Sequence, residues 1–400
     1  MKITDVTAHP VTASWNDDPT FGHYLMSSVM IRISTDGPDE GIGEVTLGYF
    51  APEAVAPLVD RFKPMLVGQD PMQIGRLTNS MCDRTRFWSR EGAGRSVISG
   101  LELALWDLAG KALGVPVCQL LGGAVRDAVP VYASGGPSLW PIERNEQKVA
   151  SYAELGYRAA KLSHYFHERL STADRPLTRP EPVDIPHAHL LDRVREMFDM
   201  LRHRFGGDFD FALDGHQNAI AQPIEVSEAI EIAETLAPCR LRFYEEPLPY
   251  TDLDGYVELR SRSRIPIAGG ECLTGLHGFH PLIDRHGVHL VQPDLGFAGG
   301  LIETQRIIHH AEGHHIGAAL HTGASFGPVL AASWHLAAAT TSVRWLERVI
   351  AGHTVHDEFM RDRMVVEEGA VATPTAPGLG IRLDGELLDR YRFVRRGARS

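Results

Sequence analysis

Apolar residues follow two different spacings along the chain, and the change from one to the other divides the sequence. Residues 26–33 and 41–46 are strand-like runs, separated by the turn signal Thr35-Asp36-Gly37. From about residue 52 to residue 113 the apolar spacing becomes helical. The pattern predicts an α+β unit at the N-terminus.

From about residue 130 onward, short apolar runs alternate with segments of helix length. Helix candidates such as 223–236, 301–312 and 329–339 fall between the runs. The strand candidates are residues 129–133, 158–162, 209–214, 241–245, 265–269, 288–292, 316–320 and 344–349. Eight such units in a row predict an α/β fold, a parallel sheet closed into a (β/α)8 barrel (TIM barrel), which takes about 250 residues.

The chain is therefore expected to have three parts. Residues 1–128 form the α+β unit, residues 129–360 the barrel, and residues 361–400 a tail that returns to the first unit. Residues 163–186, after the second barrel strand, form an unusually long connection that contains four prolines. Because long connections are often functional and this one lies at the catalytic end of the barrel, we expect a lid or a subunit contact.

Composition restricts the partners of this chain. Its 400 residues are 44% hydrophobic and 22% charged, which is typical of a globular protein with an ample core. The formal net charge, 39 − 51 = −12, argues against nucleic acid and anionic membranes as partners, since both need a basic surface. The four cysteines form no CxxC pair, and neither a signal peptide nor a membrane span is evident, so we expect a cytoplasmic protein.

Three acidic residues, Asp214, Glu245 and Glu271, each stand where a strand-like apolar run ends. They are 31 and 26 residues apart, about one strand plus one helix each time (245 − 214; 271 − 245). The carboxyl ends of successive barrel strands meet at one end of the barrel, so the three carboxylates are expected to converge. Hard oxygen ligands of this kind suit a Mg²⁺-type cation. The sequence therefore predicts a metal-assisted enzyme.

Further motifs accompany this acidic triad. They are Gly299-Gly300 after Pro293-Asp294, the run Ala-Leu-Trp-Asp-Leu-Ala-Gly-Lys at residues 104–111, and Leu-Leu-Gly-Gly at residues 120–123. In this order and spacing they resemble the enolase superfamily, mandelate racemase subgroup, over nearly the whole chain. The resemblance implies an α+β capping domain on the barrel and a homo-oligomer. It also implies one Mg²⁺ per subunit, held by the triad, and abstraction of the proton α to a carboxylate.

The resemblance assigns the catalytic base to His321. This residue ends the run 316–320, and Asp294 ends the preceding strand 27 residues upstream. In the family such an Asp–His pair is a dyad on neighbouring strands, in which the carboxylate sets the tautomer and stabilises the imidazolium. The alternative is a polar histidine at the barrel rim without a catalytic role.

The second barrel strand departs from the family pattern. Many relatives carry Lys-x-Lys there, with the second lysine as a base, whereas this chain has Lys161-Leu162-Ser163. A serine without an activating partner cannot act as that base, which counts against a two-base racemase. Lys161 either neutralises a substrate or metal-bound oxygen or forms a structural ion pair.

His216 supplies a second acid/base group. Asp214-Gly215-His216 is similar to the Asp-x-His of the galactonate dehydratase-like acid-sugar dehydratases, in which the histidine protonates the departing hydroxyl. The alternative is a histidine that is only hydrogen-bonded near the metal. Glu347 matches the family's carboxyl group that donates a hydrogen bond to the substrate carboxylate, which requires a raised pKa. A salt bridge to the flanking Arg344 or Arg348 is its alternative.

The resemblance thus implies a Mg²⁺-dependent lyase, a dehydratase that converts a sugar-derived polyhydroxy acid into a 2-keto-3-deoxy acid. His321 would remove the α-proton and His216 would expel the β-hydroxyl, with the reverse assignment left open. The rivals are a racemase or epimerase that uses His321 against Lys161 or His216, and a metal-binding scaffold without turnover. Substrate-specificity candidates in the N-terminal unit are His23, Tyr24, Tyr49 and Arg86.

Overall fold

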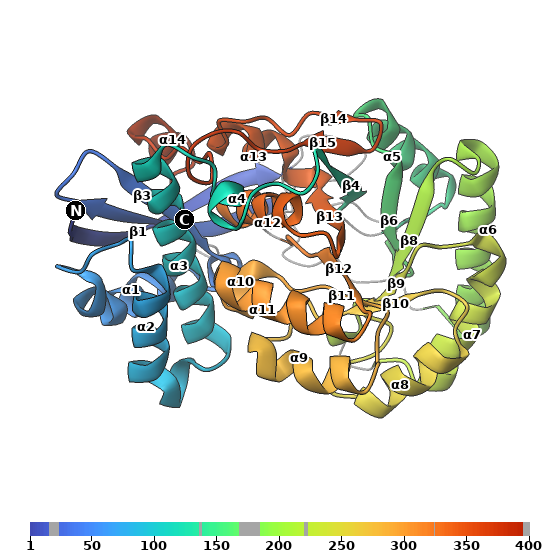
Figure 1. Ribbon diagram of the computed structural model, residues 1–400. Helices are drawn as coiled ribbons and strands as arrows, with labels where there is room; N and C mark the ends of the chain where they lie inside the picture. The colour runs from blue at the N-terminus through green and yellow to red at the C-terminus, as the bar shows by residue number, and fades with distance from the viewer. Residues whose placement is uncertain (16–23, 136–137, 168–184, 220–222, 324, 395–400) are drawn as a thin grey trace.

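The computed structural model describes residues 1–15, 24–135, 138–167, 185–219, 223–323 and 325–394. An N-terminal unit and a barrel lie next to each other, and a C-terminal tail runs along both (Figure 1). The lid or interface expected in residues 163–186 falls mostly on residues 168–184, outside the described ranges. Within those ranges, no helix combines the length and the apolar character that a membrane crossing requires.

The N-terminal unit is a three-stranded antiparallel sheet covered by three helices. Gly41 and Gly43 allow the third strand to lie directly on the third helix, because a Cβ at either position would come within 2.1 Å of a carbonyl oxygen of that helix. The strands are β1 (Ile3–Trp15), β2 (Tyr24–Thr35) and β3 (Glu40–Val45); the helices are α1 (Pro52–Leu66), α2 (Ile74–Ser89) and α3 (Gly92–Leu113). The predicted α+β character is confirmed.

The second unit is a closed barrel of eight parallel strands, as predicted. The ring closes because the last strand pairs with the first, in the register Glu347 to Tyr132. The strands are β4 (Ala128–Ser134), β6 (Ala159–Ser163), β8 (Asp210–Asp214), β9 (Tyr244–Glu245), β10 (Ile267–Gly269), β11 (Leu290–Val291), β12 (Gly317–Leu320) and β13 (Val343–Val349). All eight coincide with predicted runs, although β9 and β11 are only two residues long.

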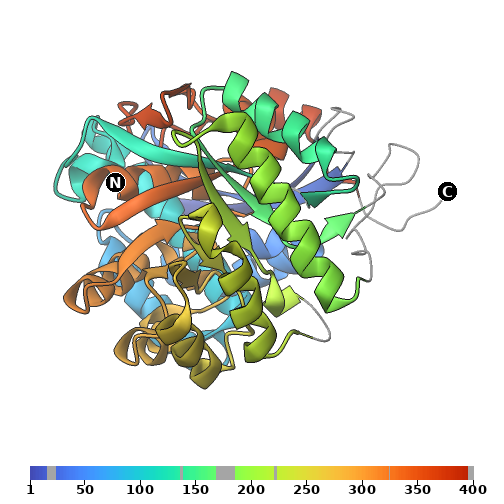
Figure 2. The ribbon, with the colours of Figure 1, turned by 90° about the vertical axis from the view of Figure 1, so that its right-hand side faces the viewer.

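Helices surround this ring, and Figure 2 shows those on the side away from the N-terminal unit. They are α5 (Glu143–Glu154), α6 (His187–Phe205), α7 (Val226–Leu236), α8 (Leu253–Arg262), α9 (Gly275–Asp284), α11 (Gly300–Gly313) and α12 (Pro328–Ala339). Shorter elements are α4 (Val117–Leu120), the parallel pair β5 (Ser138–Leu139) and β7 (Phe166–His167), α10 (Leu295–Ala298) and α13 (His353–Phe359). The fold class is therefore a (β/α)8 barrel with an N-terminal cap.

The C-terminal tail contacts both units. Its elements are β14 (Val366–Glu367), β15 (Ala370–Ala372) and α14 (Gly385–Arg390). β15 pairs antiparallel with β4 of the barrel. On the other side, Thr12 N of β1 donates a hydrogen bond to Tyr391 O at 2.9 Å. The return of the tail to the N-terminal unit is thus observed, while the domain bounds 1–128, 129–360 and 361–400 stay a prediction.

Two buried glutamates of the N-terminal unit accept hydrogen bonds from the barrel and so connect the two units. Glu44 of β3 accepts hydrogen bonds from Phe326 N at 2.6 Å and Val329 N at 3.2 Å, where α12 begins. Glu102 of α3 accepts from Leu301 N at 2.8 Å, in the first turn of α11. The N-termini of helices attract negative charge, so each contact stabilises a helix start as well as the junction. These starts lie at the barrel end where the strands finish.

Candidate active site

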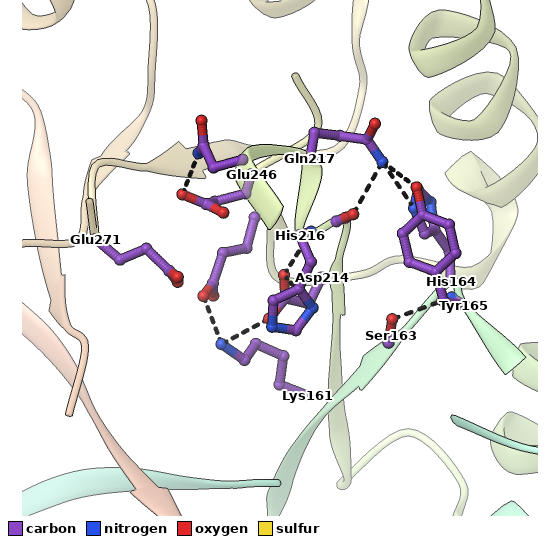
Figure 3. Close-up of polar contacts among 12 residues, drawn as sticks. Lys161, Ser163, His164, Tyr165, Asp214, His216, Gln217, Glu246 and Glu271 are labelled. Carbon is purple, nitrogen blue, oxygen red and sulfur yellow. Dashed lines mark hydrogen bonds and ion pairs between the residues drawn. The ribbon is translucent and has the colours of Figure 1, made fainter. Parts of the chain in front are cut away.

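The predicted metal ligands lie at one end of the barrel, the end that faces the N-terminal unit. Asp214 is the last residue of β8 and Glu245 the last residue of β9, and the two lie opposite each other in the parallel pairing. Glu271 follows β10 by two residues. Asp214 and Glu245 are almost fully buried, and Figure 3 shows Lys161, Asp214 and Glu271 directed toward a common region. The three residues therefore stand at the ends of three neighbouring strands, while their role as metal ligands stays a prediction.

Lys161 of β6 forms ion pairs with three carboxylates in this region. Its Nζ lies 2.5 Å from Glu245 Oε1, 3.0 Å from Asp214 Oδ2 and 3.0 Å from Glu347 Oε1. Burial lowers the pKa of Lys161, but the surrounding carboxylates outweigh it and hold the pKa well above its usual value. The side chain is therefore an ammonium group that offsets buried negative charge.

The chemistry of the donors fits a divalent cation. All three predicted ligands are carboxylates, and the buried Glu271 Oε2 accepts no hydrogen bond from the described residues, although it lies 3.3 Å from His321 Nε2. Gln292, which follows β11, donates from Nε2 to Glu245 Oε2 at 2.5 Å and so orients that carboxylate. A Mg²⁺ held by Asp214, Glu245 and Glu271 would act as a Lewis acid on a bound carboxylate.

The carboxylate oxygens of the three predicted ligands do not all lie within 4.8 Å of one another. These ligands are Asp214, Glu245 and Glu271. Over the described ranges, the sets of three potential ligand atoms within 4.8 Å of one another are different ones. One combines Glu271 with Glu246 and Cys272 beside the predicted site, and the other is Asp284, His310 and His314 on the outer helices. The Mg²⁺ site at Asp214, Glu245 and Glu271 stays a prediction.

His321 and Asp294 meet as expected from the sequence. His321 Nδ1 lies 2.8 Å from Asp294 Oδ2, and a parallel bridge joins the two residues next to β11 and β12. Asp294 Oδ1 accepts from Gly296 N at 2.7 Å and caps α10, so the carboxylate is held from both sides. This arrangement leaves His321 Nε2 directed into the mouth, 3.3 Å from Glu271 Oε2 and 3.6 Å from Glu347 Oε2.

The carboxylates around His321 determine its charge. Burial is the largest single influence and lowers the pKa of the imidazole, but the carboxylates of Glu271, Glu347 and Asp294 together outweigh it and hold the pKa well above the usual value. A cation on Glu271 would lower the pKa of His321, because Glu271 is the carboxylate that raises this pKa most.

Glu347 of β13 does not have the raised pKa that the sequence-based hypothesis required. Burial raises the pKa of Glu347, but the ammonium of Lys161 and then the imidazole of His321 lower it to about 2. In this arrangement Glu347 is held as an anion, and its role as a hydrogen-bond donor to the substrate carboxylate stays a prediction. The salt bridge to its neighbours is not found either, since Arg348 pairs with Asp357 at 2.9 Å. Glu347 instead connects Lys161 to His321 as an anion.

His216 stands at the mouth beside Asp214. Its Nδ1 lies 3.3 Å from Asp214 Oδ1, and about half of the side chain is exposed. The turn has a strained backbone, with φ of 45° at His216, and it needs Gly215 because a Cβ there would lie 2.5 Å from Glu246 O. The Asp-Gly-His sequence thus has a local structural reason, which places an accessible imidazole next to a predicted metal ligand.

A buried polar network behind His216 was not anticipated. Gln217 Nε2 lies 3.2 Å from His164 Nε2 and donates to Gly215 O at 2.9 Å (Figure 3). Burial lowers the pKa of His164 to about 3, so this imidazole is neutral and supports the turn. Ser163, at the usual position of a base, accepts from Tyr165 N at 3.0 Å. The sole sequence signal for this network was the position of His164 directly after the second strand.

The specificity candidates in the N-terminal unit have mixed outcomes. His23 and the side chain of Tyr24 lie outside the described residues. Tyr49 packs edge-on against Phe50, whose ring centroid is 6.3 Å from that of Phe297 in α10, at the barrel mouth. Arg86 lies on α2, where it is exposed and pairs with an aspartate of the same helix. Tyr49 thus keeps its place among the specificity candidates.

A (β/α)8 barrel with an α+β cap, and with carboxylates, a lysine and an Asp–His pair at its mouth, defines a protein of the enolase superfamily. The chain belongs to the mandelate racemase and muconate lactonizing enzyme family. Residues 8–122 match the model of the mandelate racemase / muconate lactonizing enzyme N-terminal domain, and residues 144–387 match the enolase C-terminal domain-like model. The resemblance expected from the motifs is confirmed, as is the prediction of an enzyme.

Several known proteins are similar to this chain over its whole length. A D-galactonate dehydratase from Xanthomonas axonopodis pv. citri is 30% identical, covering 98% of this chain and 94% of the relative. A D-galactarolactone cycloisomerase from Agrobacterium fabrum is 27% identical, covering 98% and 99%. The solved structure of an enolase from Agrobacterium radiobacter with bound Na and L-malate has a TM-score of 0.82 at 29% identity, covering 100% and 97%.

Proposed function

We propose that the protein is a Mg²⁺-dependent lyase that dehydrates a sugar-derived polyhydroxy acid to a 2-keto-3-deoxy acid. The observation that carries the proposal is the pair of imidazoles at one barrel mouth, His321 held by Asp294 and His216 beside Asp214. The names of the relatives support it, since several are D-galactonate dehydratases. The bound L-malate of one structural neighbour is itself a hydroxy acid.

The chain's own residues can carry out both proton transfers. In its neutral form, His321 donates its Nδ1–H to Asp294, which leaves the unprotonated Nε2 as the base that takes the α-proton of the substrate. The electron pair of that C–H bond moves toward the β-carbon, the β C–O bond breaks, and His216 protonates the departing oxygen to give water. The enol that results becomes the 2-keto-3-deoxy acid. When bound, Mg²⁺ stabilises the negative charge that develops on the substrate carboxylate.

Lys161 contributes charge to this reaction and takes no proton. Its ammonium lies among Asp214, Glu245 and Glu347 and is held protonated by them. An anionic substrate that approaches a protein of net charge −12 needs local positive charge, and Lys161 together with a metal ion provides it. This favours the neutralising role over that of a second base.

Incubation with a panel of mono- and diacid sugars tests the proposal. We expect a keto acid that reacts with semicarbazide, a product lighter than the substrate by one water, and loss of activity when EDTA removes the metal. Absence of a keto acid from every acid sugar, despite bound Mg²⁺, would instead support the scaffold without turnover.

An isomerase is the second candidate, and the relative named D-galactarolactone cycloisomerase favours it. Racemases and epimerases belong to the same class, because every isomerase rearranges its substrate without gaining or losing atoms. Product mass separates the two candidates, since an isomerase conserves the mass of its substrate. We also propose that the protein is cytoplasmic and forms a homo-oligomer. Light scattering on the purified protein would test the oligomeric state.

A further inference from the structure

The outer helices α9 and α11 carry a cluster of histidines that the proposed reaction does not use. The two helices lie side by side (Figure 1). His310 and His314 are four residues apart at the C-terminal end of α11, so their side chains share one face of the helix. His280 and Asp284 have the same spacing on α9 and lie opposite them. Two pairs with helical spacing therefore face each other.

Both α11 imidazoles are directed at one carboxylate oxygen. His310 Nε2 lies 2.7 Å and His314 Nε2 lies 3.5 Å from Asp284 Oδ1. The three ligand atoms stand within 4.8 Å of one another. In a tetrahedral zinc site, bonds of 2.0–2.2 Å place neighbouring ligand atoms about 3.3 Å apart. The ligand atoms stand 2.7 Å to at most 4.8 Å apart, so a metal ion enters when the side chains shift by up to about 1 Å.

Neighbouring groups hold these ligands in place. His310 Nε2 donates a hydrogen bond to Asp284 Oδ1 at 2.7 Å, and a metal ion would take the place of the shared proton. The ring of His280 packs on that of His310, with centroids 4.5 Å apart, and limits its rotation. The ring of His314 lies tilted against that of His310, with centroids 4.9 Å apart. Imidazole nitrogens with one carboxylate suit Zn²⁺ and similar transition metals better than Mg²⁺.

We propose that Asp284, His310 and His314 form a second metal site, which binds one Zn²⁺-class ion with water in the remaining position. In a (β/α)8 unit the helix starts at the C-terminal end of one strand and finishes near the start of the next. The site therefore lies at the barrel end opposite the mouth, and its metal joins α9 to α11 without touching the substrate. An ion that binds only the folded chain stabilises it. The inference is independent of the proposed function.

Zinc binding to the purified, Mg²⁺-saturated protein tests the site. We expect one tight equivalent of Zn²⁺, retained in His309→Ala, a control that removes the neighbouring exposed histidine of α11. His310→Ala, His314→Ala and Asp284→Asn should each bind that equivalent about tenfold or more weakly. Zn²⁺ should raise the unfolding midpoint of the wild type and of His309→Ala, and lose this effect in the other three. Midpoints without zinc report whether each variant is folded.

A competing zinc site consists of Glu246, Glu271 and Cys272. The variant Cys272→Ser distinguishes zinc binding at that site from zinc binding at the outer helices. Retention of the zinc equivalent in Cys272→Ser supports the outer site. Any one of three results would overturn the proposal. These are loss of the zinc equivalent in Cys272→Ser, its retention in both His310→Ala and His314→Ala, and the absence of tight zinc binding to the wild type. Crystals soaked in Zn²⁺ should show anomalous scattering between α9 and α11, and a peak only at the barrel mouth would contradict it.

Discussion

His216 and His321 enter the barrel mouth from opposite sides. His216 follows β8 and His321 follows β12, and three strands separate β8 from β12 in either direction around the closed ring. Between them lie the carboxylates, with His216 next to Asp214 and His321 next to Glu271. A substrate held over this cluster would meet one imidazole on each face. The arrangement favours elimination in which the α-proton and the β-hydroxyl leave from opposite faces.

Replacement of His321 by Asn should remove the base. The variant is expected to lose about 10²- to 10⁴-fold in kcat, the contribution of one general acid or base. It should also fail to exchange the α-proton of a bound acid sugar in D₂O, measured by NMR. Unchanged exchange would refute the role of His321. Asp294→Asn is the positioning control, and it should reduce the same exchange while the α-proton is still removed by the same imidazole.

Replacement of His216 by Asn should separate the two steps of the reaction. Without the acid, expulsion of the hydroxyl slows by a factor similar to that of the base variant, whereas His321 and its Asp294 partner are untouched. We therefore expect α-proton exchange in D₂O with little keto acid released. If exchange disappears together with dehydration while substrate still binds, His216 is the base and the assignments are reversed.

Lys161→Met should make the stability of the protein depend on Mg²⁺. Lys161 pairs with three buried carboxylates, and removal of one partner from a buried ion pair costs about 3–5 kcal/mol. A divalent cation restores the lost positive charge, so Mg²⁺ should raise the unfolding midpoint of Lys161→Met by more than that of the wild type. Lys63→Met removes an exposed ion pair with Asp5 and is the matched control. An equal response to Mg²⁺ in all three proteins would argue against a cation at the mouth.

The sequence predicts the positions of the strand ends, because apolar runs and their spacing are local signals. The carboxylates and the Asp294–His321 pair follow directly from those ends. The charge of Glu347 does not, since it depends on Lys161, which lies 186 residues earlier in the chain (347 − 161). Its lowered pKa and the network around His164 arise from contacts between distant segments, which local patterns do not contain.

The motif at residues 104–111 also acquires a physical reason from the structure. Asp107 accepts hydrogen bonds from Ile42 N and from Leu379 N, both at 2.8 Å, and so joins the cap to the tail. A Cβ on Gly110 would lie 2.6 Å from the Cα of Gly378. From the sequence this motif was recognisable only by resemblance, because its partners Ile42 and Leu379 lie 65 and 272 residues away from Asp107.

Glu102 should make stability fall as pH rises toward neutrality. Burial, the largest influence, raises its pKa from 4.5 to about 7 in the folded state. Between these two values the folded protein binds more protons than the unfolded chain, so stability is full below pH 4.5 and is lost as pH rises through 7. The difference corresponds to about 3 kcal/mol. Denaturant unfolding at a series of pH values gives the free energy of unfolding across this range. In Glu102→Gln this free energy should fall less steeply with pH than in the wild type, and an unchanged pH dependence would contradict the assignment.

Gly300→Ala should weaken the junction between cap and barrel. Gly300 has φ of 86°, and a Cβ there would lie 2.2 Å from Glu102 Oε2, the oxygen that caps Leu301 N. We expect a loss of about 1–3 kcal/mol from backbone strain and the displaced carboxylate, seen as a lower unfolding midpoint. Gly313→Ala, at the other end of the same helix, has open space around the new methyl group and should be neutral or slightly stabilising. Equal midpoints for the two variants would show that the carboxylate of Glu102 adapts and that close packing at Gly300 is not required.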